Sequence, residues 1–150
     1  MYGIISSHLI VLSAITAFAI AQGAKVVIRA FKGKKITYHD IFAYSDMPSG
    51  HTAVVVALTT ALALEYGFYS PLFAISFVFA TIVIVDAIGL RNYLGQHGKT
   101  LNVLVKDLRE DAFLDSSYPK LLERIGHTPL QVLVGGIIGV SVSFIGYLIF

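Results

Sequence analysis

The chain has no cysteine and no tryptophan, and only 13% of its 150 residues are charged. The absence of cysteine excludes disulfide bonds and thiolate chemistry. The hydrophobic content of 56% favours a membrane protein, because a soluble domain of this size has too little interior to hide so much apolar surface. A soluble protein with a buried helical core is the alternative. The start lacks the basic residues and small-residue cleavage site of a removable signal peptide. We therefore predict an integral membrane protein with a single domain over residues 1–150.

Four apolar stretches cover about residues 4–28, 52–66, 71–90 and 130–150. A spanning helix needs roughly 20 apolar residues, so the second stretch is short unless residues 49–51 form its first turn. The segment from Tyr66 to Pro71 is a predicted tight turn whose aromatic residues suit a membrane–water interface. Because helices are the spanning form for such segments, we predict an all-α integral membrane protein with four transmembrane helices.

The positive charges are distributed unevenly over this four-span arrangement. All 11 lysines and arginines fall on one side: Lys25, Arg29, Lys32, Lys34, Lys35, Arg91, Lys99, Lys106, Arg109, Lys120 and Arg124. The opposite side has only Glu65 as a fixed charge, near its turn. Because loops rich in lysine and arginine stay in the cytoplasm, we predict a cell-membrane protein with both termini outside and both polar connections inside.

The connection between the third and fourth spans, from Asn92 to Ile125, is too long for a plain loop. Residues 103–110 have the pattern of an amphipathic helix, which we expect to lie at the interface or to cap the site. Residues 116–119 should end it, and residues 120–125 are expected to form another helical turn before Gly126. This predicts a cytoplasmic amphipathic insertion between spans three and four.

Two histidines stand where helices are expected to begin. His51 follows Pro48, Ser49 and Gly50 just before the second span, and His127 lies just before the fourth. Both helices begin on the same side, and helix starts attract phosphate through the helix dipole and unpaired N–H groups. A lone histidine is more often structural, but two at helix starts predict one phosphate site that includes Ser49 and Gly50.

Three charged residues expected within or at the edge of the membrane are also candidates for the predicted site. Lys25 lies beside Gln22 on the first helix and is deep enough for a buried anion-binding role. Arg91 ends the third span, where its planar fork could grip two phosphate oxygens or extend to the headgroups. Asp86 is costly in the membrane unless paired. An ion pair of Asp86 with Lys25 or Arg91, or a role in orienting a site residue, stays open.

The fourth span adds a polar residue and a stripe of small residues. Gln131 is one helical turn after His127 and could accept a hydrogen bond from the imidazole, which would fix its tautomer. Gly135, Gly139 and Ser143 continue the same face at a spacing of four, which permits close helix packing. This packing lies either within the chain or across a homodimer formed through the Gly135 and Gly139 face.

Together these motifs resemble the divergent branch of the type 2 phosphatidic acid phosphatase (PAP2) superfamily, related to acid phosphatases and vanadium-dependent haloperoxidases. The resemblance covers nearly the whole chain and rests on residues 22–25, 47–53, 86–91, 101–102 and 126–131. The chain departs from the superfamily pattern in four ways. Lys32 and Gly33 replace Arg-Pro, no serine precedes Arg91, a long insertion separates Arg91 from His127, and Gln131 replaces an acid.

The resemblance implies a metal-independent phosphoryl transfer in two steps, with no cofactor and no nucleic-acid partner. His127 would attack phosphorus and form a phosphohistidine, while His51 would protonate the leaving oxygen and later activate water. The phosphate ligands would be Lys25, Ser49, Gly50 and Arg91. Gln131 would take the place of the catalytic acid, with Gln22, Asp86 and Asn102 in support.

The expected substrate is a membrane lipid with a phosphate or diphosphate headgroup in the cytoplasmic leaflet. One alternative is a non-catalytic protein that binds or translocates phospholipids and keeps the anion site, which Gln131 in place of an acid favours. Another is a structural four-helix membrane subunit, in which the two histidines would not share a ligand.

Overall fold

The computed structural model describes residues 2–33, 46–110, 118–123 and 125–149. These residues form helices α1 (Tyr2–Phe31), α3 (Gly50–Tyr66), α4 (Pro71–Ile88), α5 (Leu90–Glu110) and α6 (Pro129–Ile149), with no strand among them. The all-α prediction is therefore confirmed. The predicted break at Ser116 and Ser117 lies outside the described residues, as do Lys34 and Lys35.

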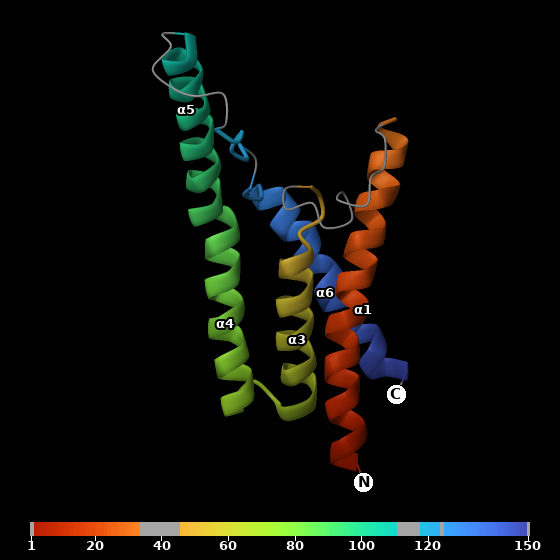
Figure 1. The fold of residues 1–150 in the computed structure, drawn as a ribbon. Helices are drawn as coiled ribbons and strands as arrows, with labels where there is room; N and C mark the ends of the chain where they lie inside the picture. Colours follow the sequence, from red (N-terminus) through yellow and green to blue (C-terminus); the bar gives the residue numbers. More distant parts are fainter. Residues whose placement is uncertain (1, 34–45, 111–117, 124, 150) are drawn as a thin grey trace.

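Helices α1, α3 and α6 pack against one another, and α4 packs mainly against α3 (Figure 1). Both termini lie toward one end of this assembly, and α3 and α6 begin toward the other. The turn between α3 and α4 forms as predicted: Gly67 ends α3 with a φ of 81°, and Ser70 caps α4 by accepting from Leu72 N at 3.1 Å. The site described below lies where α3 and α6 begin.

The lengths of the helices fit a membrane protein. Three are long and apolar enough to span: His8–Phe31, Pro71–Leu108 and Pro129–Ile149. The apolar helix α3 has 17 residues, or about 26 Å at 1.5 Å per residue, slightly less than a hydrocarbon core of about 30 Å. Large apolar side chains are exposed along α1, α4 and α6, as on a lipid-facing surface. Three of the predicted spans thus meet the length requirement, and a count of four stays a prediction.

The small-residue stripe of α6 packs against α3 in the same chain. A Cβ added to Gly135 would lie 2.4 Å from the carbonyl oxygen of Ser49, and one added to Gly139 would lie 2.6 Å from that of Ala53. Ser143 Oγ donates to a backbone carbonyl of α3 at 2.7 Å. Of the two alternatives, packing within the chain therefore accounts for the stripe. Because α3 occupies this face, a homodimer would have to use another surface.

Helices α4 and α5 form one long rod with Gly89 at the junction (Figure 1). The amphipathic helix was expected to start at Val103 but starts at Leu90, because no proline or turn cluster interrupts this stretch. Among the described helices, α5 contacts only α4. It projects beyond the other helices, so of the two alternatives, lying at the interface or capping the site, it does not cap the site.

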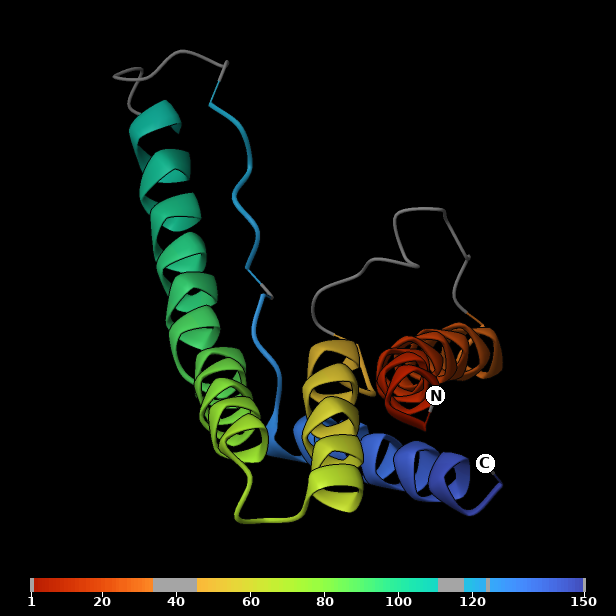
Figure 2. The ribbon, with the colours of Figure 1, turned by 90° about the horizontal axis from the view of Figure 1, so that it is seen from below.

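Residues 118–123 and 125–128, together called the return segment, run back beside α5 toward the start of α6 (Figure 2). Residues 120–125 were expected to form a helical turn, but those described are not helical. Asn102 explains the difference: its Nδ2 donates to Leu121 O, and its Oδ1 accepts from Leu121 N, both at 2.9 Å. The backbone of Leu121 thus bonds to α5 instead of forming a helix.

Two glycines on α5 let the return segment approach this closely. A Cβ added to Gly95 would lie 2.7 Å from Glu123 O, and one added to Gly98 would lie 2.4 Å from Leu122 O. With Asn102, these glycines recur every three or four residues and share one helix face. This face guides the chain from the far end of α5 back to His127.

Candidate anion site

The starts of α3 and α6 are joined by a backbone hydrogen bond. The N–H of Ser49 donates to the carbonyl oxygen of Gln131 at 3.0 Å. Ser49 is the N-cap of α3, and its Oγ accepts from Thr52 Oγ1 at 2.8 Å and from Thr52 N at 3.4 Å. Ser49 is fully buried, and these bonds satisfy its polar atoms. As predicted, the two helix starts lie side by side at one level.

His127 is held by its backbone, while its ring is left without a partner. Its N–H donates to the carbonyl oxygen of Ala87 at 2.9 Å, and its carbonyl oxygen accepts from Asn92 Nδ2 at 3.2 Å. The residue is only 1% exposed, yet neither ring nitrogen has a hydrogen-bond partner within the described chain. Buried polar atoms are nearly always bonded, so this imidazole is suited to a ligand.

Charged and titratable groups from three helices lie close enough to His127 to affect its protonation. Burial, followed by the charges of Lys25, His51 and Arg91, lowers the pKa of His127 to about 4, and Asp46 opposes the shift. The two predicted histidines are therefore close enough for their charges to repel. At neutral pH the His127 ring is uncharged and has a free lone pair, the form needed of a nucleophile.

A titration tests the environment of His127. In detergent-solubilised protein with ¹³C-labelled histidine, we expect one imidazole to titrate near pH 4, well below the ordinary value of about 6.5. Its signal should be the one missing from the His127→Gln spectrum. Because burial disfavours the charged ring, folding stability should fall as pH drops from about 6.5 toward 4. Titration of that signal near 6.5 would contradict the arrangement described here.

Lys25 and Gln22 bring polar groups from α1 to the start of α3. Lys25 is 4% exposed, so its side chain lies inside the helix assembly. The buried Oε1 of Gln22 has no hydrogen-bond partner among the described residues and lies 3.7 Å from the position of a Cβ on Gly50. Gly50 is the first residue of α3, where backbone N–H groups have no partner inside the helix.

Asp86 pairs with Arg91, one of the alternatives that the sequence left open. Arg91 Nε donates to Asp86 Oδ2 at 2.6 Å, and both side chains are partly exposed. A second pair joins Arg29 to Asp46. The Asp86 pair orients the guanidinium through Nε, so its terminal nitrogens are the ones that a phosphate would use.

Gln131 does not bond to the His127 ring. Its Oε1 accepts from Thr128 N at 2.8 Å, and Thr128 Oγ1 accepts from Gln131 N at 3.4 Å. This reciprocal pair is a capping box at the start of α6. The expected hydrogen bond to the imidazole was therefore wrong, because the amide oxygen is used to cap the helix.

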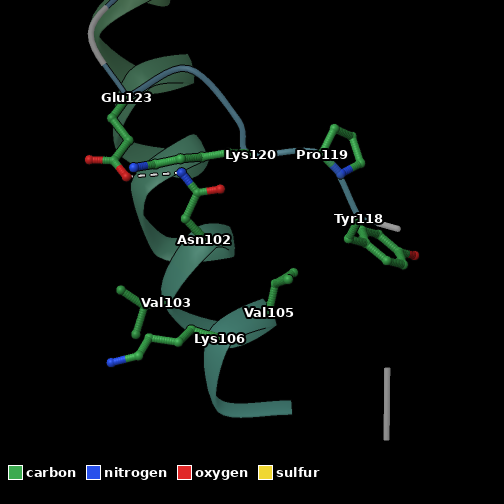
Figure 3. A pocket seen from close by; sticks show the side chains of 8 residues that line it. All are labelled: Asn102, Val103, Val105, Lys106, Tyr118, Pro119, Lys120 and Glu123. Atoms are coloured by element: carbon green, nitrogen blue, oxygen red, sulfur yellow. Dashed lines mark hydrogen bonds between the residues drawn. The ribbon is translucent and has the colours of Figure 1, made fainter. Parts of the chain in front are cut away.

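Asn102 lies away from the site. It is ten residues beyond Asn92 on α5, or about 15 Å along the helix. Figure 3 shows it beside Lys120 and Glu123, where its Nδ2 also donates to Glu123 Oε1 at 2.9 Å. A cavity of about 370 Å³ lies next to this bond. Asn102 thus holds the return segment and does not touch the ring of His127.

The residue that sequence reasoning missed is Asn92. It bonds to the carbonyl of His127, and its side chain leaves no room for a Cβ on Gly126, which would lie 2.1 Å from Asn92 Oδ1. One signal was available, since Asn92, Gly95 and Gly98 recur every three residues on a polar helix. Glycines inside a helix are costly and indicate close backbone contact.

Comparison with known proteins identified a family and a similar membrane protein. A family model described as the divergent PAP2 family matches residues 6–142. The chain is similar to the uncharacterized membrane protein YuiD of Bacillus subtilis (strain 168), with 34% identity over 143 residues, 89% of this chain and 90% of that protein. No solved structure matches the chain.

Proposed function

Because the chain belongs to the divergent PAP2 family, we propose that it is a membrane phosphatase that removes phosphate from a lipid phosphate or diphosphate without a metal. The observation that supports this most is the His127 ring, which is buried, unpartnered at both nitrogens within the described chain and close to the charges of Lys25 and Arg91. A phosphate would reach one of these nitrogens and offset the positive charge of Lys25 and Arg91.

The proposed reaction has two steps. In the first, a neutral ring nitrogen of His127 attacks phosphorus, the phosphorus–oxygen bond to the lipid breaks, and His51 gives its proton to the leaving oxygen. In the second, His51 takes a proton from water, the water oxygen attacks phosphorus, and the phosphorus–nitrogen bond breaks. His51 suits the proton-transfer role because it is exposed at the start of α3, whereas His127 is buried.

The remaining groups would stabilise the negative charge that spreads over the equatorial oxygens. Lys25 supplies a buried positive charge, and Arg91 supplies two donors in a plane. The starts of α3 and α6 add the positive ends of two helix dipoles. The Ser49 hydroxyl and the Gly50 amide are proposed ligands at the first of these starts.

A lipid substrate fits the position of these residues. They lie where long apolar helices end and polar connections begin, so a headgroup could reach them while its chains stay in the bilayer. The positive charge of the connections favours the cytoplasmic leaflet.

Phosphate release tests the proposal. Purified protein in detergent should release inorganic phosphate from lipid phosphates in the presence of EDTA, and vanadate should inhibit it by occupying the place of the transferred phosphoryl group. The measurement is free phosphate across a panel of lipid monophosphates and diphosphates. Absence of release from the whole panel would reject the enzymatic function.

One observation favours a second candidate, a non-catalytic protein that binds or translocates phospholipids. An acid at position 131 would stabilise the charged ring of His127, but Gln131 is engaged in the capping box. For such a protein, saturable binding of lipid phosphate should depend on Lys25 and Arg91 in the absence of release. Equilibrium binding measured beside the release assay separates the two candidates.

A further inference from the structure

An apolar groove of about 460 Å³ lies between α3, α4 and α6. Its walls include Val56 from α3, Ile84 from α4 and Leu133 and Ile137 from α6. Its few polar members are Thr52 and Ser141. It lies outside the group of charged residues described above, and none of the proposed catalytic steps uses it.

The groove begins at the anion site. Thr52 lines the groove and also donates its hydroxyl proton to Ser49 Oγ at 2.8 Å. Val132, in the first turn of α6, lines it as well. On α4, Ile84 lies one turn before Ala87, whose carbonyl holds the His127 backbone. One end of the groove, its mouth, therefore lies about one helical turn from Ser49 and from Ala87, which bonds to the His127 backbone.

From this mouth the groove follows α6 away from the polar end. Val132, Gly136 and Val140 succeed one another at one-turn intervals and all line it. The distance from the first to the last is about 12 Å at 1.5 Å per residue. The groove thus leads from the level of a headgroup into the apolar zone of the helices.

Gly136 keeps the groove open. In the small-residue stripe, Gly135 and Gly139 are glycines because a Cβ would collide with the backbone of α3. A Cβ on Gly136 would meet no atom within 4 Å, so helix packing does not require glycine there. Glycine is costly inside a helix. We infer that glycine occurs at position 136 because a larger side chain would fill the groove.

We propose that this groove binds a linear acyl chain of the lipid whose phosphate lies at His127. The inference rests on the proposed phosphate site, because continuity with that site selects this occupant. A lipid bound in this way keeps its chain against apolar walls, and its headgroup is held next to the ring. The hydrocarbon then contributes to recognition through burial of apolar surface.

Photolabelling tests the proposal in bilayers. The probe is dodecyl phosphate with a diazirine at the end of its chain, and the readout is mass spectrometry of the labelled peptides. We expect labelling of residues 132–141 that depends on the phosphate group. Dodecanol with the same diazirine should not reproduce it.

A matched pair of variants links the label to the groove. Gly136→Leu places a side chain in the groove and should reduce this labelling at least tenfold. Gly23→Leu is the control, because Gly23 is also a helical glycine with no atom within 4 Å of an added Cβ and does not line the groove. Its labelling should equal that of the wild type.

The outcomes distinguish the groove from the enzymatic function. Unchanged labelling in Gly136→Leu, equal labelling of all lipid-facing helices, or sensitivity confined to a farnesyl phosphate probe would each overturn the acyl-chain proposal. Specific labelling without phosphate release would support the acyl-chain proposal and reject the enzymatic function. Phosphate release with labelling elsewhere would retain catalysis and reject the groove.

Discussion

The His127→Gln variant should release phosphate about a million-fold more slowly than the wild type, the scale of loss seen when a nucleophile is removed. Glutamine keeps the size and polarity of the position but has no ring nitrogen to attack phosphorus. The backbone bonds of His127 to Ala87 and Asn92 do not involve its ring. The variant should therefore fold, and initial rates of phosphate release measure the loss.

Two additional measurements make this result specific. His97→Gln is the matched control, since His97 is exposed on α5 and should keep full activity. In the wild type, radiolabelled substrate should leave an acid-labile, alkali-stable label on the protein, as expected of phosphohistidine, and His127→Gln should lack it. An active His127→Gln variant, or an unchanged label in it, would show that another residue is the nucleophile.

The Gly98→Ala variant should lose about 100-fold in turnover, although residue 98 is remote from the chemistry. Its new Cβ would lie 2.4 Å from Leu122 O, which pushes the return segment away from α5. His127 follows at the end of this segment, and a displacement of about 1 Å at a reacting group costs on the order of 100-fold. The comparison is kcat for the variant and the wild type.

The control for this substitution is Gly23→Ala, where the added methyl group meets no atom within 4 Å. It should leave kcat unchanged. In Gly98→Ala, KM should change less than kcat, because Lys25 and Ser49 lie on other parts of the fold. An equal loss in both variants, or full activity in Gly98→Ala, would mean that the return segment does not position the nucleophile.

The features that sequence reasoning predicted depend on local signals. Apolar stretches bounded by turn residues identified the helices, and Gly67 and Pro71 identified the turn between α3 and α4. Each histidine lies at or just before the first turn of a helix because the residues around it are capping residues. The burial of Lys25 followed from its depth along a single apolar helix.

The features that sequence reasoning missed depend on contacts between distant segments. A helical period cannot reveal that Asn102 bonds to the backbone of Leu121, so residues 120–125 were expected to be helical. Gln131 had two acceptable partners at the same spacing, the ring of His127 and the N–H of Thr128. Only the geometry of the α6 start selects the second. The role of Asn92 similarly requires knowing where Gly126 lies.

The hydrogen bonds to the His127 backbone determine which helices fix the position of its ring. Ala87 and Asn92 belong to the α4–α5 rod, whereas Lys25 and His51 belong to α1 and α3. The backbone of His127 is thus tied to the α4–α5 rod, and the start of α6 that follows it is tied to α3 through the bond between Ser49 and Gln131. The position of the His127 ring therefore depends on how α4 packs against α3, so a substitution at that contact should be felt at the candidate anion site although no residue of the site is changed.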